Sequence, residues 1–116
     1  MNQRELLRRR NNIRQLIGIM NRNRNMLKWG SNETDNHINM KLEICKYLKK
    51  MGKEFYTEAI FVRSMGRADI INADDAIIYE VYQTESQKSL ELKAKKYPLE
   101  VIFVNANQEF NEKLIL

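Results

Sequence analysis

Two acidic residues interrupt two apolar stretches in the middle of the chain. Asp69 lies within residues 66–71 and Glu80 within residues 76–82, and both stretches have the composition of β-strands joined by an acidic turn at 72–75. Strand interiors disfavour acidic side chains, and a buried charge is costly unless it is paired, hydrogen-bonded or bound to a metal. Two carboxylates on neighbouring strands therefore predict a divalent-metal site.

A helix expected over residues 35–51 supplies further polar side chains. Threonine or aspartate at position 34 or 35 can cap its start, and Gly52 supplies the left-handed residue after its end. His37 and Lys41 are four residues apart and therefore lie one turn from each other on the same side of the helix. Cys45 falls on its apolar stripe and is expected to be a buried thiol.

The other elements follow from alternating or continuous apolar runs. Residues 53–62 alternate as a strand that carries Glu58, residues 87–96 form a helix, residues 99–104 form a buried strand, and residues 110–116 form a short helix or strand. The order helix, three strands, helix, strand predicts an α/β sandwich around a mixed sheet.

Length and composition indicate an ordinary soluble protein. The 116 residues suit one hydrophobic core, and no apolar run approaches the roughly 20 residues of a membrane span. The arginine-rich start lacks the uncharged central segment of a secretory signal, so a cytoplasmic location is expected. The abundance of Ile, Asn and Lys suggests an AT-rich genome such as that of a virus or mobile element.

Positive charge is concentrated at the start of the chain. Residues 1–30 carry eight basic residues and one acid, a net charge of +7, whereas residues 31–116 have a net charge of −2. The guanidinium fork suits phosphate, so we predict a basic helical arm over residues 1–30 that binds nucleic acid, ahead of a domain over residues 31–116. The arginines expected to contact the phosphates are Arg8, Arg9, Arg10, Arg14, Arg22 and Arg24.

The arm has an apolar side as well. Residues 2–28 are compatible with a helix that is frayed or split near Gly18, and the apolar residues near one of its faces are Leu6, Ile13, Ile17, Met20 and Leu27. Two alternatives to nucleic-acid binding therefore remain: the helix packs on the core or on a second subunit, or, more weakly supported, it lies on an anionic membrane.

Residues 35–105 resemble the PD-(D/E)xK, or restriction-endonuclease-like, nuclease superfamily. The resemblance rests on the order of elements, on His37-x-x-x-Lys41, on Glu58, on Arg67-Ala68-Asp69-Ile70 and on Glu-Val-Tyr-Gln-Thr-Glu-Ser from Glu80. These motifs are most similar to those of competence-protein-like nucleases and archaeal Holliday-junction resolvases.

The resemblance implies an α-β-β-β-α-β core and Mg²⁺- or Mn²⁺-dependent hydrolysis of phosphodiester bonds, in DNA rather than RNA, by an endo- or exodeoxyribonuclease. It implies that Asp69 and Glu80 hold the metal, with Glu58 as a third carboxylate. It also adds Arg67 to the residues expected to bind nucleic acid, and family analogy suggests a homodimer.

The chain departs from the family pattern at one position. Tyr82 stands where the family lysine is expected, so the missing group would come from Gln83 or from Lys41, with His37 close to it. If neither serves, the protein is a catalytically inactive nucleic-acid-binding module of the same fold.

Structural roles are the remaining alternative for these acids. Asp69 can pair locally with Arg67, and Glu80 can pair with Lys93 or Lys41 as an anchor. Asp74 and Asp75 are expected to be plain turn residues. In that case the chain is a structural or interaction protein, and its basic arm binds a partner or a membrane.

Overall fold

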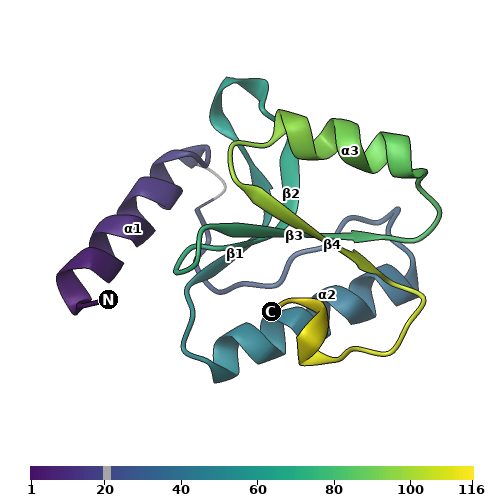
Figure 1. Cartoon of the computed structure of the whole chain (residues 1–116), viewed down its shortest axis with the longest axis horizontal. Helices are drawn as coiled ribbons and strands as arrows, with labels where there is room; N and C mark the ends of the chain where they lie inside the picture. Colours follow the sequence, from purple (N-terminus) through teal and green to yellow (C-terminus); the bar gives the residue numbers. More distant parts are fainter. Residues whose placement is uncertain (20–21) are drawn as a thin grey trace.

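The structure, a computed structural model, describes residues 1–19 and 22–116 (Figure 1). It confirms a mixed α/β fold with a four-stranded sheet between helices. The helices are α1 (Gln3–Gln15), α2 (Asp35–Lys50) and α3 (Gln87–Lys96), and the strands are β1 (Phe55–Ile60), β2 (Arg67–Asn72), β3 (Ile77–Tyr82) and β4 (Glu100–Asn105). Short 3-10 turns cover Val62–Ser64 and Glu112–Leu114. None of the helices in these described ranges is long and apolar enough to cross a membrane.

The strands lie in the order β1-β2-β3-β4. Pairs β1/β2 and β2/β3 are antiparallel and joined by short connections, whereas β3/β4 is parallel and joined by α3. This division follows from chain geometry, since a parallel pair needs a long crossover. Figure 1 shows α2 and α3 on opposite faces of the sheet, with α1 beside the β1 end.

The ends of α2 and α3 lie where the sequence predicts them. The hydroxyl of Thr34 accepts a hydrogen bond from the His37 amide, and the hydroxyl of Ser86 accepts one from the Ser89 amide. Gly52, just after α2, has φ +71°, the left-handed conformation that glycine adopts without strain. These local signals fix how α2 presents its polar residues.

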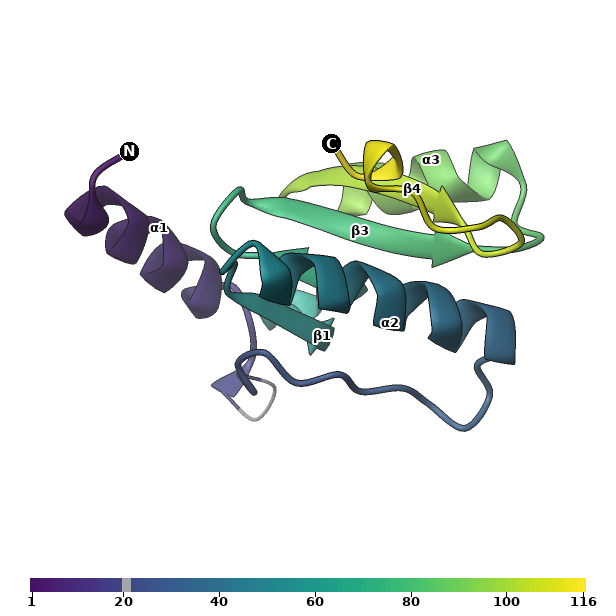
Figure 2. The same ribbon diagram turned by 90° about the horizontal axis from the view of Figure 1, so that it is seen from below.

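Each face of the sheet carries its own apolar cluster. On one face α2 contributes Ile44 and Leu48, which pack with Ile70 and Val104; Figure 2 shows α2 running across this face. On the other face the buried residues include Ile13 and Ile17, from α1 and the segment after it, with Tyr56, Ile71 and Ile78 from the sheet. The predicted basic arm thus packs on the sheet.

Helix α1 ends at Gln15 and does not continue to residue 28 as the apolar pattern allowed. The chain then runs along the edge of β1: the Gly18 amide donates to the Ile60 carbonyl at 2.9 Å, and the Asn25 amide donates to the Phe55 carbonyl at 2.8 Å. We call residues 16–19 and 22–28 the edge segment. This stretch is rich in asparagine and has a weak helix propensity, so hydrogen bonding to the open edge of β1 is favoured over continuing the helix. Met20 lies outside the described residues.

Candidate active site

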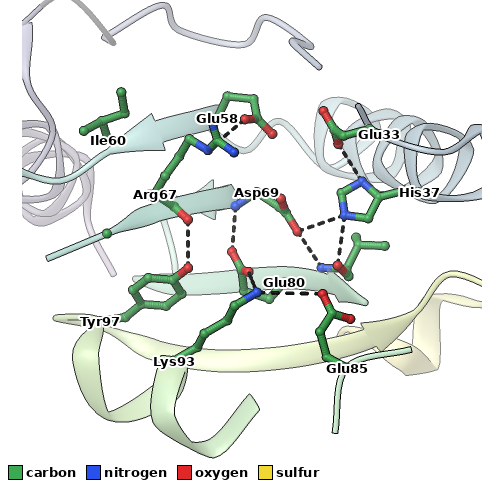
Figure 3. Close-up of a pocket in the computed structure, with 12 residues that line it drawn as sticks. Glu33, His37, Glu58, Ile60, Arg67, Asp69, Glu80, Glu85, Lys93 and Tyr97 are labelled. Atoms are coloured by element: carbon green, nitrogen blue, oxygen red, sulfur yellow. Dashed lines mark hydrogen bonds and ion pairs between the residues drawn. The ribbon is translucent and has the colours of Figure 1, made fainter. Parts of the chain in front are cut away.

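Strands β2 and β3 part at Asp69 and Glu80. Their ladder pairs Asn72 with Ile77 and Ile70 with Tyr79, but the next opposite pair, Asp69 and Glu80, is joined through side chains. The Asp69 amide donates to Glu80 Oε1 at 2.7 Å, and the Val81 amide donates to Asp69 Oδ2 at 2.8 Å (Figure 3). Each carboxylate therefore takes the place of a lost backbone acceptor, which fixes its position and leaves its second oxygen for other ligands.

Glu58 lies at the same level of the sheet. It has φ +49°, and the ladder between β1 and β2 skips it between Thr57 and Ala59. Its carboxylate contacts Lys41 Nζ at 2.7 Å and Arg67 Nε at 3.1 Å. The left-handed backbone thus brings a third carboxylate to the point where the sheet opens.

A cavity of about 670 Å³ occupies this opening. Its wall is rich in ionisable side chains from five different parts of the chain, and acids outnumber bases. The acids are Glu33, Glu58, Asp69, Glu80 and Glu85, and the basic or titratable groups are His37, Arg67 and Lys93. We call this the carboxylate cavity.

His37 lies against two of these acids. Its Nε2 is 2.9 Å from the Val81 carbonyl and 3.4 Å from Asp69 Oδ2, and its Nδ1 is 2.5 Å from Glu33 Oε1 without hydrogen-bond geometry. Interaction with Asp69 raises the pKa of His37 to about 8, with Glu33 adding to the effect and burial opposing it. One ligand atom each from Glu33, His37 and Asp69 lies within 4.8 Å of the other two.

Glu80 is buried beside Asp69 with little positive charge to balance it. Burial raises the pKa of Glu80 to about 8, and repulsion from Asp69 adds to this. Lys93, in α3, opposes the shift only weakly because its Nζ lies 3.9 Å from Glu80 Oε2 and equally far from Glu85 Oε1. The charged form of Glu80 is therefore poorly stabilised by its surroundings.

Lys41 lies behind the cavity wall. Its ammonium is fully buried and donates to the Lys28 carbonyl at 2.8 Å, to Glu33 and to Glu58. The predicted catalytic lysine thus holds two acids of the cavity and the edge segment together.

Tyr82, the last residue of β3, and Gln83, the residue after it, point away from the carboxylate cavity. Tyr82 packs edge-on against Phe103, with ring centroids 6.5 Å apart. The Gln83 amide nitrogen donates to Asn107 at 3.0 Å, and its carbonyl oxygen accepts from the Thr34 hydroxyl. Neither residue lines the carboxylate cavity.

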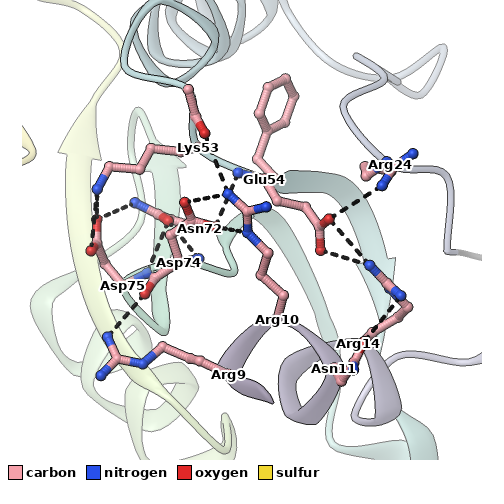
Figure 4. Close-up of polar contacts among 12 residues, drawn as sticks. Arg9, Arg10, Asn11, Arg14, Arg24, Lys53, Glu54, Asn72, Asp74 and Asp75 are labelled. Atoms are coloured by element: carbon pink, nitrogen blue, oxygen red, sulfur yellow. Dashed lines mark hydrogen bonds and ion pairs between the residues drawn. The ribbon is translucent and has the colours of Figure 1, made fainter. Parts of the chain in front are cut away.

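Three of the six arginines predicted to bind phosphate lie against carboxylates of the domain instead. Arg10 forms a bidentate pair with Asp74 at 2.6 and 2.9 Å, and both distances from Arg14 Nη2 to the Glu54 carboxylate are 3.1 Å (Figure 4). Asp74 is buried and is not the plain turn residue that the sequence predicts. The other arm arginines differ: Arg9 donates to the Asp74 carbonyl, Arg22 donates to the Ile17 carbonyl, Arg24 lies 3.7 Å from Glu54, and Arg8 is exposed.

Four polar or aromatic residues of the site were not singled out as site residues from the sequence: Glu33, Glu85, Lys93 and Tyr97. Glu33 precedes α2, and its spacing of four from His37 was the available signal. Lys93 was expected only as a possible structural partner of Glu80. The Tyr97 hydroxyl donates a hydrogen bond to the Arg67 carbonyl at 2.7 Å. This carbonyl lies in the part of β2 that no longer pairs with β3, and no sequence signal marks the contact.

No model of a known protein family, no curated protein and no solved structure matches the chain. Its function is therefore inferred from the residues and geometry of the site.

Proposed function

We propose that the protein is a Mg²⁺- or Mn²⁺-dependent nuclease of the PD-(D/E)xK type that hydrolyses phosphodiester bonds in DNA. The observation that carries this proposal is the pair Asp69 and Glu80, held opposite each other where β2 and β3 part, at the wall of an acid-rich cavity. The element order and the mixed sheet, with α3 crossing between β3 and β4, are compatible with a restriction-endonuclease-like core.

The donor set suits a divalent cation. Mg²⁺ takes oxygen ligands, commonly one or two carboxylates with water and substrate phosphate, and Asp69 and Glu80 would provide these carboxylates. A histidine nitrogen close to Asp69 fits Mn²⁺ better than Mg²⁺, since imidazole is a ligand of transition metals. When bound, such an ion polarises a phosphoryl oxygen and makes water a stronger nucleophile.

The cationic side chains of the cavity have separate tasks. Lys93 would supply the ammonium that Tyr82 does not, because its Nζ lies close to Glu80 and Glu85 and can also reach a phosphate in the cavity. With a pKa of about 8, His37 is mostly protonated near pH 7 in the metal-free protein and would favour an anionic substrate. Arg67, paired with Glu58, adds a guanidinium at the wall.

An inactive nucleic-acid-binding module is the second candidate. The observation that favours it is the placement of Tyr82 against Phe103 and of Gln83 against Asn107, since neither takes the position of a catalytic lysine at the cavity. In that case phosphate binding would be retained without hydrolysis.

A cleavage assay separates the candidates. Plasmid, linear duplex, single-stranded and four-way-junction DNA are incubated with Mg²⁺ or Mn²⁺ and wild-type protein, Asp69→Asn or Glu80→Gln. Loss of a carboxylate ligand should lower the cleavage rate by about a thousandfold. Glu100→Gln is the matched control, an exposed strand glutamate that should leave the rate unchanged.

Two results contradict the nuclease proposal. Cleavage that survives both carboxylate substitutions would exclude this site. Absence of cleavage on every substrate, with salt-sensitive DNA binding retained, would select the inactive module. Calorimetric titration with Mn²⁺ reports metal binding separately, and the heat should disappear in Asp69→Asn.

A further inference from the structure

A second cavity, of about 330 Å³, lies beside the start of β1. The described residues that line it are Arg14, Arg22, Arg24 and Tyr56. It shares none of these with the carboxylate cavity. We call it the arginine pocket.

Two of its guanidinium groups are held in place. Arg14 donates through Nε to the Tyr56 hydroxyl at 3.0 Å and through Nη2 to Glu54, and Arg22 donates through Nε to the Ile17 carbonyl at 2.9 Å. The partners are themselves fixed, since Tyr56 is 1% exposed and Glu54 is buried. Side chains ordered in advance lose less entropy when they bind an anion.

The pocket has unbalanced positive charge. Glu54 is the acid in contact with Arg14 and, at 3.7 Å, with Arg24, so three guanidinium groups face one carboxylate. Beyond its Nε, the Arg22 side chain makes no hydrogen bond to another described residue, and the Arg24 side chain is 69% exposed. These free N–H groups can form the forked contacts that guanidinium makes with phosphate. Arg10 differs, because Asp74 takes both arms of its fork.

We propose that the arginine pocket binds an internal phosphodiester of the DNA strand whose scissile phosphate lies in the carboxylate cavity. This inference rests on the proposed function. Strand β1 contributes Tyr56 to the pocket and both Glu58 and Ile60 to the cavity. These positions are two to four residues apart, or about 7 to 13 Å along a strand. Measured along the axis of duplex DNA, at about 3.4 Å per nucleotide of one strand, that separation corresponds to roughly two to four nucleotides.

The salt dependence of DNA binding tests the pocket. Fluorescence anisotropy with a labelled single-stranded oligonucleotide, in EDTA and over a range of KCl concentrations, compares wild type with the double variant Arg22→Gln/Arg24→Gln. Each lost phosphate contact lowers the slope of log K against log salt by about 0.7, so the double variant should lose about 1.4. Lys46→Gln/Lys113→Gln removes two exposed charges from the α2 and C-terminal side and should leave the slope unchanged.

The outcomes distinguish this inference from the nuclease proposal. Because no metal is present, the binding result does not depend on whether the protein cuts DNA. An equal loss of slope in the two double variants would overturn the assignment of the arginine pocket as a phosphate site. A loss confined to oligonucleotides with a 5′-phosphate would overturn the internal assignment in favour of a terminal phosphate. If the double variant unfolds, the exposed Arg24→Gln alone should lose about 0.7 in slope.

Discussion

Asp74 and Glu80 are both buried acids, yet their surroundings are opposite. Burial opposes the ionisation of Asp74, but hydrogen bonds from Arg10 and from the Glu54 amide outweigh it, and the pKa of Asp74 is lowered. Burial also opposes the ionisation of Glu80, and there Asp69 adds repulsion while Lys93 remains 3.9 Å away, so its pKa rises to about 8. The two acids are 5% and 4% exposed, so burial alone does not explain the difference.

The difference separates an acid that holds the fold together from acids that are available to a ligand. A structural carboxylate has an oppositely charged partner within the folded protein, as Asp74 has in Arg10. In the carboxylate cavity, Glu80 instead faces the like charge of Asp69, and the ammonium of Lys93 lies 3.9 Å from it. Perturbed acids of this kind are typical of functional sites.

The largest effect is expected from Glu80→Gln in metal-free protein. The folded pKa of about 8 lies above the unfolded value of 4.5, so the unfolded state ionises first and the free energy of unfolding falls between these pH values. Glutamine keeps the acceptor for the Asp69 amide without the charge. The variant should therefore be more stable than wild type at pH 8, on the order of 3 kcal/mol, and equally stable below pH 4.5.

Urea unfolding of wild type and Glu80→Gln, at a series of pH values in EDTA, measures this difference in the free energy of unfolding. A wild-type stability that is flat from pH 5 to 8, or a variant that is less stable at pH 8, would show that Glu80 is paired much as Asp74 is.

Asp74→Asn should have the opposite sign. It removes the charge that Arg10 pairs with, and we expect a loss of about 2 kcal/mol in the free energy of unfolding at pH 7. Since the folded pKa of Asp74 is lowered, its stabilisation is present above the ordinary value of 3.8 and is lost as the pH falls through the lower folded value. The deficit of the variant should therefore shrink in acid.

Asp75→Asn is the control for this substitution. Asp75 is the more exposed neighbour in the same turn and pairs with Lys53 at 3.4 Å, so its removal should cost less than about 1 kcal/mol. Equal losses at the two positions would mean that the Arg10 pair contributes no more than a surface contact.

Tyr97→Phe should have the smallest effect of the three. The Tyr97 hydroxyl donates to the Arg67 carbonyl at the point where β2 has left β3, and its loss should lower the free energy of unfolding by about 1 kcal/mol. Thermal unfolding, with Tyr47→Phe as the control for the loss of a hydroxyl, measures the change. A decrease of more than about 3 kcal/mol in the free energy of unfolding would instead indicate that this hydrogen bond is required for the arrangement of β2 and β3 at the cavity.

Local sequence signals predicted much of this molecule. Capping residues and apolar periodicity placed α2 and α3, and the mixed sheet followed from the order of elements. The predicted residues Glu58, Asp69, Glu80 and His37 all line one cavity. The three acids lie at matching positions of neighbouring strands, and His37 approaches Asp69 from α2. Their metal-binding role stays a prediction.

The contacts that were not predicted join residues far apart in sequence. Nothing local marks Asp74 as the partner of Arg10, 64 residues away. The weak helix formers near Gly18 did predict a break close to the end of α1 at Gln15, but not that the chain after it pairs with β1. For Glu80 the sequence did offer two partners, Lys93 or Lys41: Lys93 Nζ lies 3.9 Å from Glu80 Oε2, whereas Lys41 pairs with Glu33 and Glu58. Such contacts depend on the assembled sheet and on which acids it leaves without a partner.

The edge segment has a consequence for how the N-terminal region can be studied. It covers the outer hydrogen-bonding groups of β1 and is tied to the domain through Lys28 and Lys41. A protein that begins after residue 28 would present a bare strand edge, together with the apolar surface that Ile13 and Ile17 cover, and would self-associate. The described part of the N-terminal region thus covers apolar surface and a strand edge, so the role of its arginines can be tested by substitution and not by truncation.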